Sequence, residues 1–417
     1  MTTWWRDIPL VARSLMTIRF LRSVSQGALA VDFVLYLHAM HWSAAAIGLL
    51  LMASGLTGAL LSIVVGLISD QYGRKPFLLF YEGGLVLGTL LIVFTHLRIV
   101  LIVVAIFFAF GRGANGSSGP FAPAEQAWLA SVIPPLRRGS LFSVNAALTF
   151  WGMAIGSFLA GVLPGFLTGT QPVVRFDPLF WLTIVIGVIN AVQIWWTPEP
   201  KPQATERVAE NVSSIDETTV RHQENKALSL LALVNTINSL GVGLIAPLLP
   251  YWFSVRFGVG PKAIGPVYGL TFLLTGLSSL AIGKVSQRIG LMGSIIWPRF
   301  IGVIALISMA FMPSFLPAAI LYILRSVVNR GSMGTRQAFS VSLVRDKRRG
   351  FASSLNAVSW TVPASIGPAI GGWLMGMGSL DWPFVLASAL QLGYIVVFPR
   401  VMGQYDPTRG LSKSSLT

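Results

Sequence analysis

The sequence predicts an all-α membrane protein in which twelve transmembrane helices form two pseudo-symmetric six-helix bundles. Three observations carry this prediction: the composition, the number of apolar segments and a repeat between the two halves. Of the 417 residues, 54% are hydrophobic and only 11% are charged, which leaves too little polar surface for a soluble domain. We therefore expect the chain to lie in a lipid bilayer.

Twelve apolar segments are bounded by charged or turn residues, and most reach the roughly 20 residues that cross the hydrocarbon layer. We expect the spans at about residues 14–40, 44–69, 77–97, 99–133, 140–168, 178–196, 227–253, 263–283, 291–312, 316–343, 351–377 and 382–399. The loops predicted on one side hold most of the Lys and Arg, whereas the others hold only Arg98, Arg175, Arg256 and Lys262. By the positive-inside rule, we expect both termini to be cytoplasmic. We further expect a multi-pass protein of the plasma (cell inner) membrane.

A polar segment, residues 197–226, separates six spans from six and is rich in Pro, Glu, Thr and Ser. Such a composition buries too little apolar surface to fold alone. We therefore predict an N-terminal bundle over residues 1–196, a cytoplasmic linker over 197–226, and a C-terminal bundle with a short cytoplasmic tail over 227–417.

The two halves also repeat each other at nearly constant offsets. In the first set, Ile47, Gly48, Gly66, Ser69 and Gly73 recur as Ile264, Gly265, Gly283, Ser286 and Gly290. In the second set, Gln126, Arg138, Gly139, Asn145, Gly156 and Gly161 recur as Gln337, Arg349, Gly350, Asn356, Gly367 and Gly372. We infer that the two six-helix halves share one structural plan.

The segment GLISDQYGRKP, residues 66–76, sets Asp70, Arg74 and Lys75 at the end of a long apolar run. Small residues allow helices to approach closely, an acid accepts hydrogen bonds from a helix end, and the cations stay in water. This pattern resembles the loop between helices 2 and 3 of the major facilitator superfamily, and the resemblance covers nearly the whole chain. It implies a twelve-helix secondary transporter whose halves rock around a site near the membrane midplane.

The resemblance also implies an inner gate. In it, Glu125 at the inner end of the fourth span meets the cations of the 66–76 loop, Arg74 or Lys75. We assign Asp70 to the same gate, together with Arg336 at the inner end of the tenth span. Because Gln287 stands where Asp70 stands in the first half, we expect inner gating to be asymmetric.

Ionisable residues within spans are costly and usually functional. Asp32 lies in the first span, and Arg112, which opens RGANG in the fourth, lies within about a turn of it in depth. RGANG resembles the Arg-x-x-x-Gly element of proton-coupled facilitators, which implies that Asp32 carries a proton and that Arg112 tunes it. A guanidinium favours the charged carboxylate, whereas burial favours the neutral acid. The alternative is a permanent structural ion pair.

The tenth span carries Arg325, Asn329 and Arg336 on one helical face, with Arg330 pointing elsewhere. If this face lines the central cavity, it can bind an anionic group. In the alternative, Arg336 reaches the inner surface and Arg325 joins helices.

Further candidates for the substrate cavity are polar or aromatic residues of other spans, Tyr36, Asn235, Asn238, Trp151 and Trp360. The alternative for the asparagines is an interhelical contact, and for the aromatic residues it is packing.

No enzymatic or metal-binding pattern is present in the sequence. The four histidines are scattered, the chain has no cysteine, and no Gly-rich loop ends in Gly-Lys-Ser/Thr. The net charge of +15 resides mostly in short inner loops rather than in one basic domain. We therefore predict neither an enzyme nor a metal, cofactor or nucleic-acid partner.

The sequence thus favours a monomeric, proton-coupled secondary transporter that exports small amphipathic organic compounds by alternating access, driven by the proton gradient. The alternative is a proton-coupled symporter or uniporter of an organic anion held by Arg112 and Arg325. A membrane receptor would need a folded output domain, and the linker and tail are too short to supply one.

Overall fold

The computed structural model describes residues 8–108, 110, 121–167, 171–199, 214–331, 333–345 and 348–405, and the regular structure in these ranges is helical. The first half contains α2 (Leu10–Ala39), α3 (Ala44–Tyr72), α4 (Lys75–Thr95), α5 (Arg98–Phe108), α6 (Ala122–Val132), α7 (Pro135–Val162), η2 (Leu163–Leu167), η3 (Val174–Phe176) and α8 (Asp177–Trp196). The second half contains α9 (Ser214–Gly243), η4 (Ala246–Leu248), α10 (Leu249–Phe257), α11 (Pro261–Ala310), α12 (Phe315–Gly331), α13 (Met333–Ser342), α14 (Arg349–Gly376), α15 (Trp382–Met402) and η6 (Gly403–Tyr405).

These helices account for the twelve predicted spans. The pairs α5 and α6, α9 and α10, and α12 and α13 each share one predicted span, whereas α11 covers two that meet at Gly290, where φ is 74°. A residue with positive φ breaks the α-helical path, and glycine adopts it without a steric penalty. Within the described ranges, eight helical stretches are long and apolar enough to cross a membrane.

The helices differ from the predicted boundaries in two places. Pro247 and Pro250 fall where the structure replaces one long helix by η4 and α10, because proline lacks the amide donor that continues a helix. In addition, α9 begins at Ser214, inside the segment predicted as linker. The domain boundaries at residues 196 and 226 stay predictions.

Equivalent glycines pack the helices within each half. In the first half, Gly156 of α7 lies against the backbone of α2 at Val24. In the second half its repeat partner, Gly367 of α14, lies against the backbone of α9 at Gly243. A side chain at either position would collide with the facing backbone, so these glycines set how closely the helices approach.

Two further pairs of repeated glycines join the halves to each other. Gly161 of α7 meets Gly265 of α11, where an added Cβ would lie 2.5 Å from the Gly161 nitrogen. On the other side, Gly48 of α3 meets Gly372 of α14. Because Gly48 and Gly265 are repeat partners, as are Gly161 and Gly372, the two contacts are related by the internal symmetry.

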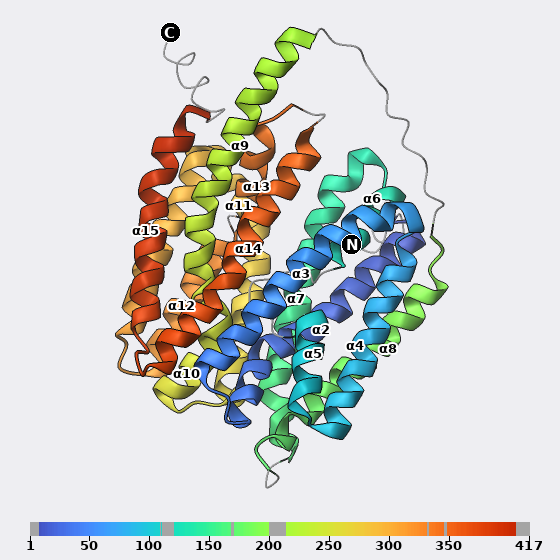
Figure 1. Cartoon of the computed structure of the whole chain (residues 1–417), viewed down its shortest axis with the longest axis vertical. Helices are drawn as coiled ribbons and strands as arrows, with labels where there is room; N and C mark the ends of the chain where they lie inside the picture. The colour runs from blue at the N-terminus through green and yellow to red at the C-terminus, as the bar shows by residue number, and fades with distance from the viewer. Residues whose placement is uncertain are drawn as a thin grey trace.

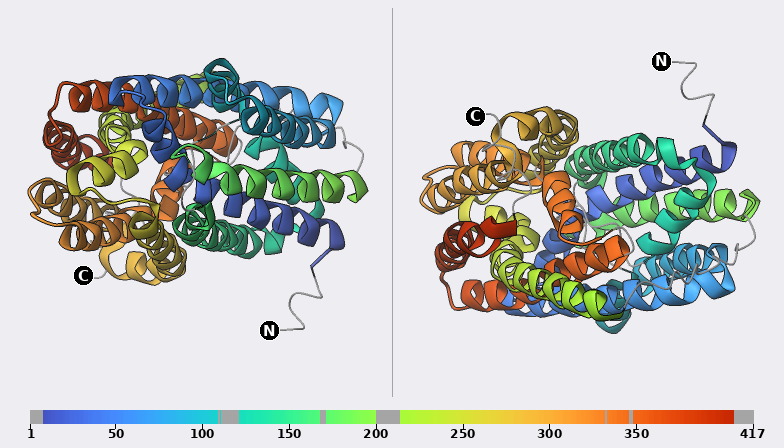
Figure 2. Two further views of the ribbon diagram at one scale, coloured as in Figure 1. Left: turned by 90° about the horizontal axis from the view of Figure 1, so that it is seen from below. Right: turned by 90° about the horizontal axis from the view of Figure 1, so that it is seen from above.

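Both contacts between the halves lie at one end of the molecule. We call the end that carries Trp196 and Ser214 the linker end, and the opposite end the far end. From their contact at the far end, α3 and α14 diverge toward the linker end (Figure 1). Seen along the helices, the first and second halves of the chain lie side by side (Figure 2). Close backbone contact therefore holds the halves together at the far end.

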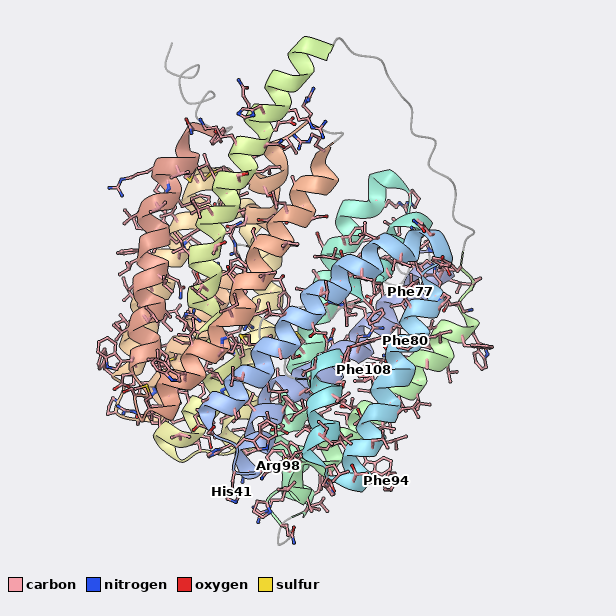
Figure 3. All side chains as sticks on the ribbon, viewed as in Figure 1. His41, Phe77, Phe80, Phe94, Arg98 and Phe108 are labelled. Atoms are coloured by element: carbon pink, nitrogen blue, oxygen red, sulfur yellow. The ribbon has the colours of Figure 1, made fainter. Side chains whose placement is uncertain are left out.

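The outer surface of the bundles is apolar, as a bilayer requires. Phe80 and Phe94 of α4 are 69% and 73% exposed and lie at the periphery of the molecule (Figure 3). Exposed Leu, Ile, Val and Trp side chains occur on most of the other long helices.

A cysteine pair tests the far-end contact. An added Cβ at Gly376 of α14 would lie 3.6 Å from the Ala45 Cβ of α3, within the ~3.5–4.5 Å of disulfides. Because the native chain has no cysteine, Ala45→Cys with Gly376→Cys should oxidise to one defined bridge that dithiothreitol reverses. The measurement is loss of maleimide labelling, with each single variant as control. Two thiols that stay reactive after oxidation would contradict the contact.

Candidate functional site

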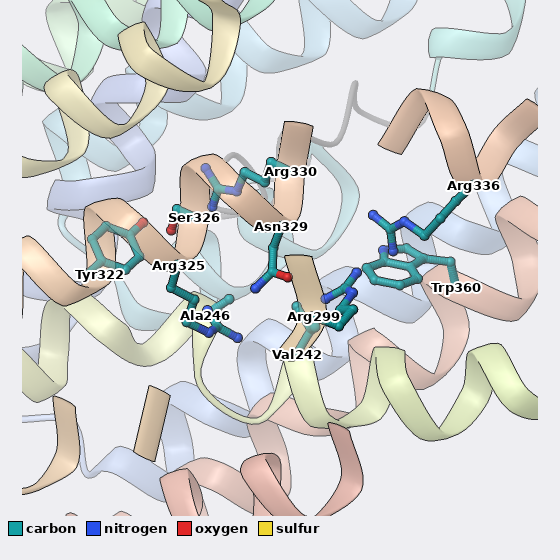
Figure 4. A pocket seen from close by; sticks show the side chains of 10 residues that line it. All are labelled: Val242, Ala246, Arg299, Tyr322, Arg325, Ser326, Asn329, Arg330, Arg336 and Trp360. Atoms are coloured by element: carbon teal, nitrogen blue, oxygen red, sulfur yellow. The ribbon is translucent and has the colours of Figure 1, made fainter. Parts of the chain in front are cut away.

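A cavity in the second half gathers most of its buried arginines. It is lined by Val242, Ala246, Arg299, Tyr322, Arg325, Ser326, Asn329, Arg330, Arg336 and Trp360. These residues come from α9, η4, α11, α12, α13 and α14 (Figure 4). The ten described lining residues include four arginines and no Asp or Glu.

Three of the four arginines in this cavity have no carboxylate partner among the described residues. Arg299 is 2% exposed and Arg325 is 6% exposed. Among the described residues, the side chains of Arg299, Arg325 and Arg336 form no ion pair or hydrogen bond, and the Nε of each is buried without an acceptor. Burying a charge without a counter-charge costs several kcal/mol (order of magnitude). The arrangement is therefore chemically suited to bind an anion.

Aromatic rings support these cations. The guanidinium carbon of Arg336 lies 4.6 Å from the centroid of the Trp360 ring, and that of Arg299 lies 5.6 Å from it. Arg330 lies 5.0 Å from the Phe272 ring. Each cation–π contact stabilises a desolvated cation by up to about 2 kcal/mol. The Nε groups of Arg299 and Arg336 still lack an acceptor among the described residues and can donate to a ligand.

Four residues predicted for the transport site line this cavity: Arg325, Asn329, Arg336 and Trp360. Arg336, which is also predicted for the inner gate, lies beside Trp360, and its gate role stays a prediction. Arg330 was expected to point elsewhere, and this prediction is wrong because Arg330 also lines the cavity. The long side chain of arginine reaches beyond the face on which its Cα lies.

Arg299 was not recognised from the sequence. It lies in α11 within the predicted span at residues 291–312. The available signal was a cation in an otherwise apolar segment. The sequence does not show that Arg299 lies beside α12 and α13, because that position depends on how the helices pack.

The remaining cavity candidates do not line this space. Asn235 donates through Nδ2 to Asn356 Oδ1 at 2.9 Å and thereby joins α9 to α14. Asn238 and Tyr36 are fully buried. Trp151 packs from α7 against α11. The hydrogen bond of Asn235 and the packing of Trp151 fit the alternative roles of these two residues, whereas the amide of Asn238 has no hydrogen-bond partner among the described residues.

Asp32 does not line the arginine cavity. It lies in α2, its side chain is 0% exposed, and neither carboxylate oxygen has a hydrogen-bond partner among the described residues. Its predicted partner, Arg112, lies outside the described residues. The proposed pair therefore stays a prediction.

The first half buries its charges as a compensated network. Arg22 of α2 donates through Nε to Glu82 Oε1 of α4 at 2.8 Å and pairs with Glu125 of α6. Asn190 of α8 donates to the same Glu82 oxygen at 3.3 Å, and Arg19 Nε lies 3.9 Å from Glu125 Oε1. Two buried cations and two buried anions thus join three helices, and Asn190 adds a fourth.

This network corrects the predicted contact of Glu125. The sequence suggested that Glu125 meets Arg74 or Lys75, but its carboxylate binds Arg22 and lies near Arg19. The reason is orientation, because Glu125 lies in the first turn of α6 and is buried toward α2. Arg74 instead donates through Nη1 to the Ala127 carbonyl at 3.1 Å.

The loop between α3 and α4 is held by residues that follow α8. Glu199 accepts hydrogen bonds from the Arg74 and Lys75 backbone N–H groups, at 2.5 and 3.1 Å. The Lys75 Nζ donates to the Trp195 carbonyl at 2.6 Å. The side chain of Asp70 lies outside the described part of the structure. A carboxylate thus binds the exposed amides at the start of α4, as an N-terminal cap does.

The second half holds its own inner loop from the other end of the linker. Glu224 of α9 accepts hydrogen bonds from Arg345 Nε at 3.1 Å and from Arg348 Nη1 at 2.7 Å. Glu199 and Glu224, near the two ends of the predicted linker, therefore each bind a loop of their own half.

Sequence comparison assigns the chain to a family. A profile described as Major Facilitator Superfamily matches residues 15–230 and again 231–415. The chain belongs to the major facilitator superfamily. This confirms the resemblance seen in the 66–76 segment and the predicted fold of two related six-helix bundles.

Similar proteins include transporters of this superfamily. An uncharacterized membrane protein of Saccharomyces cerevisiae is 21% identical, covering 92% of this chain and 91% of its own. The multidrug resistance protein MdtG of Proteus mirabilis is 23% identical, covering 74% of each chain. The crystal structure of a variant of the nucleoside transporter NupG has a TM-score of 0.73 at 11% identity, covering 94% of this chain and 99% of its own. The chain is a multi-pass membrane transporter of the major facilitator superfamily.

Loss of Arg22 tests whether the network stabilises the first bundle. Arg22→Leu leaves Glu82 and Glu125 buried without their shared cation, which should lower the free energy of unfolding by about 3–5 kcal/mol. The measurement is the unfolding temperature of the purified protein in detergent. Arg98→Leu, which removes an exposed cation at the start of α5, is the matched control. Equal unfolding temperatures for the two variants would contradict the role of the network.

Proposed function

We propose that this protein is a secondary transporter of small organic anions, which bind in the arginine-lined cavity. The observation that carries the proposal is the set of four arginines around one cavity whose described lining contains no acid. This function corresponds to the second hypothesis from the sequence. The helices that hold the cavity belong to one half, and the other half would move against it during alternating access.

The guanidinium groups suit this task. Arginine stays charged, and its planar fork pairs with two oxygens of a carboxylate or phosphate at once. An anion among Arg299, Arg325 and Arg336 would supply the counter-charge that these side chains lack. Bound substrate would thereby remove much of the cost of their burial.

The far-end glycine contacts support a cavity that opens toward the linker end in this conformation. We propose that the linker end is cytoplasmic, because the positively charged loops gather there. We further propose a monomer in the plasma membrane. The halves would then separate at Gly48 and Gly161 to release or accept substrate on the opposite side.

Neutral variants of the cavity arginines test this proposal. Arg299→Gln and Arg325→Gln should each weaken organic-anion binding by about tenfold or more, since each removes a charge-assisted hydrogen bond. Neither should lower the unfolding temperature, because removing an uncompensated buried charge relieves repulsion. Binding is measured by calorimetry, and uptake by counterflow in proteoliposomes.

Arg256→Gln is the matched control for these variants, because Arg256 is an exposed arginine in the last turn of α10. It should leave binding and uptake unchanged. Unaltered anion transport in both cavity variants would refute the proposed site.

Asp32 supports coupling of transport to protons. A carboxyl group buried in the first bundle without a described partner can exist neutral or charged, and a change of conformation can shift that balance. In Asp32→Asn, a pH gradient should no longer drive accumulation, whereas exchange of labelled for unlabelled anion should continue. A pH electrode and a counterflow assay separate these two activities. Undiminished gradient-driven uptake would exclude Asp32 as the coupling group.

Export of amphipathic compounds is the second candidate function. It is favoured by the similarity to the multidrug resistance protein MdtG. Proton movement in proteoliposomes exposed to lipophilic cations or to organic anions separates the two candidates. Flux elicited only by cations and lost in Asp32→Asn would favour export.

A further inference from the structure

We infer that the cavity selects organic dianions, bearing a phosphate monoester or two carboxylates, over monoanions. This inference rests on the proposed function and narrows its substrate class.

Two of the guanidinium groups converge on one aromatic ring. Arg299 extends from α11 and Arg336 from α13, and both lie against the Trp360 ring of α14, at 5.6 and 4.6 Å from its centroid. Two cations from separate helices thus contact one ring. One anionic group that reaches both would accept up to four N–H donors, which suits the multiple oxygens of a doubly charged group.

The cationic surface continues beyond this pair. Arg325 and Arg330, both on α12, line the same cavity as Arg299 and Arg336. The cavity thus presents four cations rather than one isolated binding point. A monoanion would satisfy one member and leave its neighbours repelling one another in a buried space. A second negative charge on the ligand removes that repulsion.

The rest of the lining indicates a compact ligand with polar groups. Tyr322 and Ser326 of α12 contribute hydroxyl groups to the wall that carries Arg325. Val242 and Ala246 add small apolar side chains to the lining (Figure 4). Hydroxyl groups can bond a polar ligand skeleton, whereas the small apolar residues leave room for its carbon atoms.

Matched ligands on one aromatic skeleton test the inference. Benzoate carries one charge, and phthalate and phenyl phosphate carry two at pH 7.5. We expect both dianions to bind the purified full-length protein about tenfold or more tightly than benzoate. Isothermal titration calorimetry measures the dissociation constants, and the shift of the unfolding temperature provides an independent reading.

Proton titration of the ligand adds an internal control. A phosphate monoester takes up its second proton near pH 6, so the affinity for phenyl phosphate should fall between pH 7.5 and pH 5.5. The affinity for benzoate should change much less over this range. Equal pH dependence of both ligands would indicate titration of the protein rather than recognition of the second charge.

Arg336→Gln should reduce the preference itself. Loss of one member of the convergent pair should weaken phenyl phosphate binding about tenfold while weakening benzoate binding less. Arg336→Lys should recover part of the preference because it restores the charge without the fork. Arg256→Gln should change neither ligand.

The outcomes separate this inference from the proposed function. Benzoate binding as tightly as both dianions would overturn dianion selection and leave anion transport standing. If neither monoanion nor dianion binds, the proposed function fails as well. An unchanged preference in Arg336→Gln would overturn the assignment of the convergent pair.

Discussion

Charge buried away from water is the constraint on which the rest of this structure depends. In a bilayer such a charge must meet a counter-charge, or its cost must be offset by another interaction. The first bundle meets the constraint internally, because Arg22 lies between Glu82 and Glu125. The second bundle does not, because its cavity holds four arginines and no described acid, and aromatic rings contact only Arg299, Arg330 and Arg336 among them. The two halves share one helical plan, but the first pairs its buried arginines with acids and the second does not within the described residues.

This difference assigns distinct mechanical properties to the halves. A network that joins four helices makes the first bundle resist internal rearrangement, since any helix shift separates buried ions. The glycine contacts at Gly161 and Gly48 instead bind the bundles through backbone surfaces without charge. Such a surface can separate without exposing an unpaired ion to the bilayer. Rigid bundles joined by a neutral interface are the arrangement that rocking requires.

The features of the structure that the sequence predicts are those that depend on the pattern of neighbouring residues. Spans follow from runs of apolar residues, and the repeated glycines follow from a shared plan, so both were found. The partner of a buried charge depends instead on helix rotation. The prediction for Glu125 is wrong for that reason, because a small change in rotation exchanges one neighbour for another. The prediction for Arg330 is wrong because its long side chain reaches beyond the face on which its Cα lies. Arg299 was missed because one arginine in an apolar segment does not reveal which helices face it.

The absence of an acid from the described lining of the cavity also affects how the proposed substrate would drive the transport cycle. A ligand shifts a conformational equilibrium only by its differential affinity for the two states. In a cavity open to water, solvent screens the four cations, but when the halves close around it the screening is lost and their repulsion grows. The empty transporter would therefore resist closure, whereas a bound dianion would cancel the repulsion that opposes it. The same missing counter-charge would then provide both selectivity and the requirement that substrate be present before the halves move.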